Sequence, residues 1–362
     1  MYLTFGEIMM RVAPEGFLRF RQAMPGKVDI TFAGGEANVA ASLAMLGDSA
    51  RYLTALPDNP IAECCLASLR ALGIDVSHVL MRKKGRLGIY FLETGANQRS
   101  SVVVYDRDGS AVAAAGPEEY DFDAALEGVR WVHVTGITPS IGENACRANL
   151  ALVQRAKAKG ASVSCDLNFR KKLWNWRPGT DSRALARECM SAVLPFVDLA
   201  IANEEDASDV LGIEAEGTSV EEGKINAEAY EQVAREIVAR FPNISRVGIT
   251  LRESVSASHN NWGAMLYDAA AGKAFFAPLD EAGEYRPHEI RDIVDRVGGG
   301  DSFAGGLIHA LNSKDFAAPA DAIRFAVAAS CLKHSIKGDF NFISREEAAA
   351  LAAGQASGRV RR

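Results

Sequence analysis

Cysteine and histidine are scarce in this sequence, and neither is arranged to hold a metal. The 362 residues include 6 cysteines and 6 histidines. The cysteines form no CxxC pair and are too sparse for a disulfide scaffold, and the histidines form no HExxH motif. These absences argue against a zinc site and favour a reduced, cytoplasmic location.

An excess of charge of one sign and a long hydrophobic run are also lacking. The 40 basic residues are balanced by 46 acidic ones, which gives no general basic field for nucleic acid or an anionic membrane. No apolar stretch approaches the length of a bilayer span, and the N-terminus has no signal-peptide pattern. We therefore expect a globular protein with no nucleic-acid or membrane partner, ending in a basic tail at 353–362.

Three consecutive glycines form the most informative stretch. Gly298, Gly299 and Gly300 follow the apolar, strand-like run 290–294 and precede a helical pattern. Without Cβ atoms the backbone can turn sharply and aim several N–H groups at one point, and the start of a helix favours an anion. The pattern predicts an anion hole for phosphate.

Asp301 follows these glycines directly. A carboxylate beside an anion hole should repel phosphate, unless it faces a hydroxyl that loses its proton while attacking phosphorus. We therefore predict that Asp301 is a general base. The simpler alternative is that the glycines make a tight turn and Asp301 caps the helix.

A second glycine turn begins at Gly34 and Gly35 and leads into a helix-forming run that Gly47 ends. The two glycines would let a polar ligand approach the helix start, where Asn38 lies one turn in. The alternative is a small-residue helix that packs tightly on a sheet.

Strand and helix patterns alternate along most of the chain. The predicted strands are 2–8, 51–56, 76–81, 131–135, 162–166, 199–202, 245–251, 263–267 and 290–294, and the predicted helices are 34–46, 61–72, 142–159, 182–194, 227–240, 317–336 and 344–353. This alternation predicts a mostly parallel sheet covered on both faces, with ligands at the carboxyl ends of its strands. The stretch 214–223 is expected to be a surface loop.

Two segments, at about 12–30 and 87–115, read instead as β excursions that could form a small sheet over the main domain. Tyr90, Tyr105 and Arg107 would project polar tips from it. A solvated hairpin is the alternative.

Polar residues follow two of the predicted strands. Arg170 could bind a carboxylate or phosphate with its planar fork, or form a surface ion pair with Asp166. Glu205 and Asp206, just after Asn203, could hold Mg²⁺ through water. Otherwise Asn203 is a helix N-cap with acids in the first turn.

Taken together, the two glycine motifs resemble the signatures of the PfkB or ribokinase-like family of sugar kinases. The stretch 34–47 is similar to the N-terminal signature and 295–306 to the C-terminal one, in the expected order. The resemblance implies a ribokinase-like three-layer α/β/α sandwich over 1–352, with a mostly parallel central sheet and a small β lid. Tyr90, 105–107, 166–170 and 333–341 are similar to the 2-keto-3-deoxygluconate kinase branch.

That branch implies ATP-dependent phosphorylation of the terminal C6 hydroxyl of a six-carbon keto acid. The implied substrate-binding residues are Gly34, Gly35, Asn38, Tyr90, Tyr105, Arg107, Arg170 and Asp301. The implied nucleotide-binding residues are Asn203, Thr250, Arg252, Gly298, Gly300 and Ala328. Asp301 is the implied base, 298–300 the implied anion hole, and Arg107 with Arg170 the implied carboxylate clamp.

The resemblance also implies ATP and Mg²⁺ as cofactors, with a monovalent cation as a further candidate. Separately, the two β excursions could pair between subunits and form a homo-oligomer through the lid. The chain departs from the family pattern at several positions. Arg296 and Val297 replace two threonines, Gly299 replaces alanine, Asp206 replaces glutamate and Arg252 replaces glycine.

Three other functions compete with the sugar-acid kinase. A neutral-sugar kinase such as a fructokinase would not need Arg107 and Arg170 to face the pocket. A sugar-binding regulator could keep the fold without catalysis, although intact Asp301 argues against it. A dinucleotide-dependent oxidoreductase is disfavoured because neither glycine motif reads GxGxxG, and there is no Walker loop.

Overall fold

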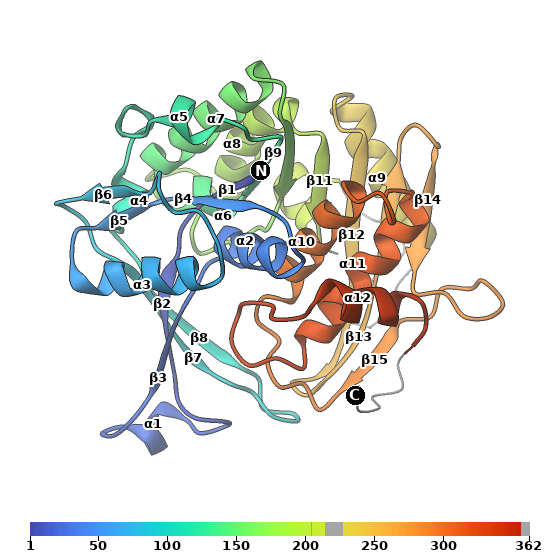
Figure 1. Cartoon of the computed structure of the whole chain (residues 1–362), viewed down its shortest axis with the longest axis horizontal. Coiled ribbons are helices and arrows are strands. Elements are labelled where there is room, and N and C mark those ends of the chain that lie inside the picture. The colour runs from blue at the N-terminus through green and yellow to red at the C-terminus, as the bar shows by residue number, and fades with distance from the viewer. Residues whose placement is uncertain (204, 214–226, 356–362) are drawn as a thin grey trace.

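A nine-stranded sheet forms the centre of the computed structural model, which describes residues 1–203, 205–213 and 227–355 (Figure 1). Its strand order is β14-β13-β12-β11-β10-β9-β1-β4, and β15 pairs with β13. The strands from β12 to β4 are parallel, whereas β13, β14 and β15 pair antiparallel. Their bounds are β1 Tyr2–Phe5, β4 Ala50–Leu53, β9 Trp131–Thr135, β10 Ser162–Asp166, β11 Leu199–Ala202, β12 Arg246–Ser256, β13 His259–Asp268, β14 Lys273–Ala277 and β15 His288–Arg291.

Helices cover both faces of this sheet because successive strand residues point to opposite sides. In β11, Leu199 and Ile201 join one apolar core, while Ala200 and Ala202 join the other. The first core includes residues of α2 Gly35–Met45, α3 Pro60–Ala71, α10 Gly299–Leu311, α11 Pro319–Lys333 and α12 Arg345–Ala352. The second includes residues of α5 Phe122–Ala125, α7 Glu143–Ala158, α8 Ser182–Val193 and α9 Ala227–Arg240. The predicted three-layer α/β/α arrangement is confirmed.

A separate four-stranded sheet, the lid sheet, projects from the body at the lower left of Figure 1. Its order is β3-β2-β7-β8, with β2 Met9–Ala13, β3 Asp29–Ala33, β7 Gly88–Glu93 and β8 Val102–Asp106. The short helix α1 Phe20–Ala23 lies at its tip. The expected small β lid is therefore present. The strands of the first excursion span Met9 to Ala33, three residues beyond the expected 12–30 at each end. Those of the second span Gly88 to Asp106 and stop short of the expected 115, because 111–115 returns to the main core through Ala111, Val112 and Ala115.

Smaller elements complete the chain. A two-stranded pair joins β5 Ala55–Pro57 to β6 Leu80–Arg82. Short helical turns occupy α4 Ala111–Ala114, η1 Pro117–Glu119, α6 Ile137–Ser140, η2 Leu194–Phe196 and η3 Ala207–Leu211. Within the described ranges no helix is both long and apolar enough to cross a membrane. The six cysteines are free.

Some local predictions were wrong. The run 290–294 was expected to be a strand leading straight into the glycines, but β15 ends at Arg291 and a loop follows. The run 290–294 is apolar for another reason, because Ile293 is buried in the loop and not in a strand. The stretch 76–81 is a strand only from Leu80. The surface loop predicted at 214–223, and 356–362 of the predicted basic tail, lie outside the described residues.

Candidate active site

The glycine turn predicted to be an anion hole begins helix α10. Gly298 is the N-cap of this helix and has a positive φ of 84°. The helix itself starts at Gly299, so Asp301 is its third residue. A Cβ on Gly298 would overlap the backbone oxygen of Asp339, so this position requires glycine. The first N–H groups of a helix have no partner within it. Gly298, Gly299 and Gly300 all line one cavity of about 420 Å³.

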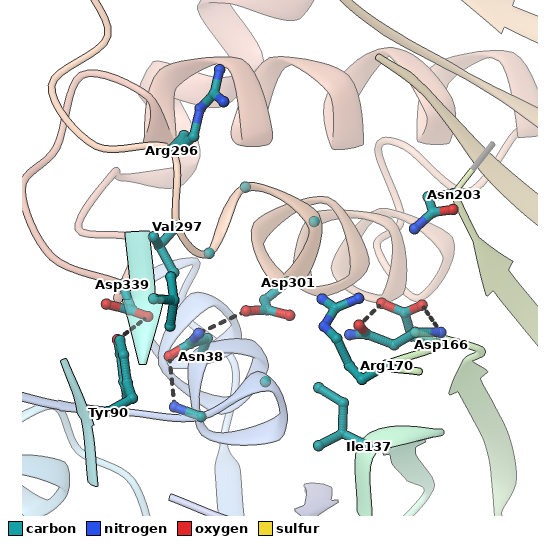
Figure 2. A pocket seen from close by; sticks show the side chains of 18 of the residues that line it. Asn38, Tyr90, Ile137, Asp166, Arg170, Asn203, Arg296, Val297, Asp301 and Asp339 are labelled. Atoms are coloured by element: carbon teal, nitrogen blue, oxygen red, sulfur yellow. Dashed lines mark hydrogen bonds between the residues drawn. The ribbon is translucent and has the colours of Figure 1, made fainter. Parts of the chain in front are cut away.

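Asp301 lies in the first turn of α10 and faces the second glycine motif. The Asn38 amide nitrogen donates to an Asp301 carboxylate oxygen over 2.6 Å (Figure 2). The N-cap residue of α10 is Gly298, and Asp301 lies in the first turn of the helix, so Asp301 does not hold the N-cap position. Burial raises the pKa of Asp301 to about 6, while the Asn38 bond holds it down. Asp301 is thus a carboxylate poised to exchange a proton near neutral pH.

The second glycine motif places its helix against the same cavity. Gly34 is the N-cap of α2, and a Cβ there would overlap the backbone oxygen of Glu7. The Gly34 N–H donates to the Asn38 side chain over 3.3 Å, which fixes the amide that reaches Asp301. Gly34, Gly35 and Asn38 all line the cavity. The alternative of tight helix packing holds as well, since α2 is buried along most of its length.

Two buried carboxylates lie at the carboxyl ends of β10 and β11. Asp166 and Asp206 both line the cavity. The Asp206 carboxylate accepts the backbone N–H groups of Phe169 at 2.9 Å and Asn203 at 3.0 Å. Burial and the neighbouring Asp206 charge raise the pKa of Asp166 well above its usual range. A cation near this pair would relieve that repulsion.

The predicted metal ligands are placed differently from one another. Glu205 is exposed and does not line the cavity, so it is less well placed than Asp206. The Asn203 side chain accepts the N–H groups of Glu205 and Asp206, as the N-cap alternative expected. In the part of the chain that the structure describes, no group of three or more His, Cys, Asp or Glu residues could hold a metal ion. This arrangement fits Mg²⁺ held through water better than a closed metal site.

Arg170 enters the cavity from the loop after β10. Its side chain is exposed, and one guanidinium nitrogen donates to the Phe169 carbonyl over 3.0 Å. Arg170 and Asp166 are both described and form no ion pair, so the surface ion-pair interpretation is not supported. Figure 2 shows the Arg170 guanidinium between Asp301 and Asp166. It can therefore meet an anionic group of a ligand close to the base.

The lid sheet supplies the opposite wall. Tyr90, Tyr105 and Arg107 all line the cavity. Tyr90 and Arg107 are buried, so the solvated-hairpin alternative is wrong for these two side chains. The Arg107 guanidinium is buried and ion-paired with Glu7, which neutralises part of its charge. The Tyr90 hydroxyl donates to Asp339 over 2.7 Å, and Tyr105 is half exposed with its ring centroid 6.0 Å from that of Tyr90. Of the two predicted clamp arginines, Arg170 forms no ion pair with a described residue, although the Asp166, Asp206 and Asp301 carboxylates lie near enough to interact with its charge.

The wall near the glycine turn contains most of the predicted nucleotide residues. Thr250, Arg252 and Asn203 line the cavity together with Trp262 and Arg296. Ala328 does not line it, because its side chain is fully buried within α11. Its contact with a nucleotide stays a prediction.

Sequence reasoning missed several residues at this site. Arg11, Glu7, Asp295, Asp339 and Lys333 are buried charged residues around the cavity, and Glu7 and Asp339 line it. Asp339 lies in the stretch 333–341 that carried the family resemblance, which is the only signal that could have found it. Arg11 carries no local signal at all.

Comparison with known proteins agrees with this geometry. Residues 2–344 match the model of the pfkB family of carbohydrate kinases. The chain belongs to that family. A crystal structure of a 2-dehydro-3-deoxygluconokinase from Thermotoga maritima is 42% identical, with a TM-score of 0.87, and the match covers 98% of this chain and 99% of that one. The predicted ribokinase-like fold and carbohydrate kinase class of this pfkB-family chain are confirmed.

Two further relatives are similar to this pfkB-family kinase over most of its length. A 2-dehydro-3-deoxygalactonokinase from Haloferax volcanii is 28% identical over 346 residues, which cover 95% of this chain and 94% of that protein. A 2-dehydro-3-deoxygluconokinase from Thermoproteus tenax is 27% identical over 311 residues, which cover 85% and 80%. Both names describe kinases of six-carbon 2-keto-3-deoxy sugar acids.

Proposed function

We propose that this pfkB-family kinase transfers the γ-phosphoryl group of ATP to the terminal C6 hydroxyl of 2-keto-3-deoxy-D-gluconate. The observation that carries the proposal is the contact between Asn38 and Asp301. It joins the glycine turn of α2, suited to sugar hydroxyls, to the glycine turn of α10, suited to phosphate. The similarity to the Thermotoga maritima enzyme supports the choice of substrate.

An acidic substrate is supported by the cations in the cavity. Arg170 lines the cavity, and its guanidinium donates a hydrogen bond to the neutral carbonyl of Phe169. Arg107 lies across the cavity in the lid wall. A guanidinium binds a carboxylate through paired, charge-assisted hydrogen bonds, which a neutral sugar cannot form. The carboxylate of a sugar acid would meet Arg170 first, since Glu7 already balances Arg107.

The chain's own residues would carry the reaction as follows. Asp301 accepts the proton of the attacking hydroxyl, and Asn38 holds the carboxylate in place. The N–H groups at the start of α10 stabilise the negative charge of the transferring group. Tyr90 and Tyr105 cover the substrate and exclude water. When bound, Mg²⁺ would neutralise phosphate charge, and Asp166 and Asp206 are the residues that would hold its water ligands.

A second candidate substrate is 2-keto-3-deoxygalactonate, which the Haloferax volcanii relative favours. It carries the same carboxylate and the same terminal hydroxyl, so the Arg170 and Asp301 roles are unchanged. The two acids differ only in the configuration of a hydroxyl group. The dependence on a monovalent cation stays a prediction.

The substrate class is tested with arginine variants in a coupled ADP-release assay with ATP and Mg²⁺. Removing a charge-assisted contact costs about 1.5–3 kcal/mol, so Arg170→Ala should lower kcat/KM for the keto acid by about ten- to hundredfold. Arg107→Ala should lower it less. Arg86→Ala is the matched control, because its guanidinium pairs with Asp106 and lies outside the cavity lining. Equal turnover of fructose or ribose, unchanged by Arg170→Ala, would overturn the acid substrate.

We also propose that two copies associate through their lid sheets. β8 is an edge strand whose residues are all exposed. Val103 and Tyr105 line the cavity, so the alternating Val102 and Val104, 48% and 55% exposed, face the other side. An open apolar edge strand is a surface that pairs with another strand. A second copy supplies the same edge and would cover it.

A further inference from the structure

Arg11 is a buried cation in lid strand β2 that reaches out of the lid sheet. The residue is 3% exposed. One guanidinium nitrogen lies 2.5 Å from an Asp295 carboxylate oxygen, and another bonds to Asp339. Asp295 and Asp339 belong to two loops of the main domain. A buried charge is tolerated only with well-formed partners, and Arg11 finds both of its partners outside the lid.

Asp295 connects Arg11 to the segment that leads into the glycine turn. Its other carboxylate oxygen accepts the Val297 N–H over 3.1 Å. The oxygen that meets Arg11 also accepts the Gly338 N–H over 3.1 Å. A single carboxylate therefore fixes the residue before Gly298 and the loop that contains Asp339.

Asp339 connects a second lid strand to the same turn. Its carboxylate accepts a hydrogen bond from the hydroxyl of Tyr90, a β7 residue (Figure 2). It also accepts one from the guanidinium of Arg11. Its backbone oxygen lies where a Cβ on Gly298 would be, so it is in direct contact with the turn. Two lid strands thus hold the residue that supports the backbone of the anion hole.

The charges in this group balance. Lys333 is fully buried, donates to the Ile336 carbonyl over 3.1 Å, and lies close enough to Asp295 and Asp339 to feel their charge. Two buried cations therefore face two buried carboxylates. Loss of the Arg11 charge would leave Lys333 as a counter-charge, which favours folding of Arg11 variants.

We propose that Arg11 and Asp339 are positioning residues that couple the lid sheet to the anion hole, so that the two move as one unit when the sugar is covered. The inference rests on the proposed function. Arg11 does not line the cavity, so its effect on turnover would be indirect. Substrate held by the lid would set the Gly298 backbone through Asp339 and Asp295.

Steady-state kinetics on Arg11→Met, Arg11→Lys and Asp339→Asn test the coupling. Misplaced catalytic groups cost up to about a hundredfold, so Arg11→Met should lower kcat by about ten- to hundredfold at saturating keto acid and ATP. Arg11→Lys should recover part of the loss because it keeps one ion pair. Arg51→Met is the matched control, since it removes an ion pair with Asp75 outside the cavity and should keep normal kcat. Full kcat in Arg11→Met would overturn the proposal.

Hydrogen exchange in the unliganded protein tests the same link without any substrate. Arg11→Met and Asp339→Asn should speed exchange across 295–301 by tenfold or more, whereas Arg51→Met should not. Unchanged exchange in 295–301 would overturn the proposal. If the Arg11→Met chain does not fold, Tyr90→Phe, which removes only the hydroxyl bonded to Asp339, is expected to speed exchange in the same segment. A wild-type protein inactive on every sugar acid would sink the proposed function, while this exchange pattern would still report on the link.

Discussion

The pH dependence of turnover should be set by Asp301. Burial raises the pKa of this carboxyl from 3.8 to about 6. Below that pH the protonated form cannot accept the substrate proton. The ionised fraction is about one half at pH 6 and about one tenth at pH 5, so kcat/KM for the sugar acid should fall about tenfold from pH 8 to pH 5. An aspartate with the ordinary value would lose only a few per cent over that range.

The fall in kcat/KM at low pH is the acid limb of the pH profile. The hydrogen bond from Asn38 should determine the pH at which this limb lies. Donation from Asn38 favours the charged carboxylate and lowers the Asp301 pKa against the effect of burial. A charge-assisted bond contributes about 1.5–3 kcal/mol, so Asn38→Ala should move the limb upward by about one to two pH units. The absolute kcat/KM should fall as well, but the position of the limb is a separate observable.

The assay is a pH profile of kcat/KM for the keto acid at saturating ATP and Mg²⁺, from pH 5 to pH 9. Asn144→Ala is the matched control, because Asn144 lies in the first turn of α7 and not in the cavity lining. The residual turnover of Asp301→Asn should not fall between pH 8 and pH 5. This result would distinguish titration of Asp301 from titration of ATP, which is the same in both proteins. If the acid limb stays in place in Asn38→Ala, the Asn38 hydrogen bond does not set the pKa of Asp301.

Three further results are expected. Asp301→Asn should lower kcat by at least about a hundredfold with little change in substrate KM, and near-normal turnover would exclude Asp301 as the base. Burial raises the pKa of Glu36 from 4.5 to about 7, so its contribution to stability is full below pH 4.5 and is lost as pH rises through 7. Glu36→Gln should therefore raise the free energy of unfolding by about 3 kcal/mol relative to wild type at pH 8. At pH 4.5 the free energy of unfolding should hardly change, and denaturant titrations at the two pH values measure the difference. Val102→Glu with Val104→Glu should convert the proposed dimer to a monomer in sedimentation, whereas an unchanged mass would contradict association through β8.

The sequence predicted the elements that carry a local signature. Apolar periodicity located the helices α2 and α7, and glycine before a helical run identified both turns of the cavity. Proximity of the two turns could be expected from the family resemblance and from the rule that ligands gather at the carboxyl ends of parallel strands, but not from either turn alone. Asn38 and Asp301 are 263 positions apart, and their hydrogen bond confirms that the turns face one another.

The buried charge network could not be predicted in this way. Arg11 and Asp339 are 328 positions apart, and nothing near Arg11 distinguishes it from an exposed arginine of a β excursion. The same holds for the Glu7 partner of Arg107, which reduces the charge available to a substrate. Ala328 was assigned by family position alone, and the packing of α11 buries it. Such pairings arise from tertiary structure, which sets burial and counter-charges.

The most direct test of the account is turnover by the wild-type protein with ATP and Mg²⁺ across 2-keto-3-deoxygluconate, 2-keto-3-deoxygalactonate, fructose and ribose, with the product identified by phosphorus NMR. We expect the highest kcat/KM for 2-keto-3-deoxygluconate and a phosphate ester on its terminal hydroxyl. A higher kcat/KM for a neutral sugar, or phosphate attached elsewhere, would contradict it.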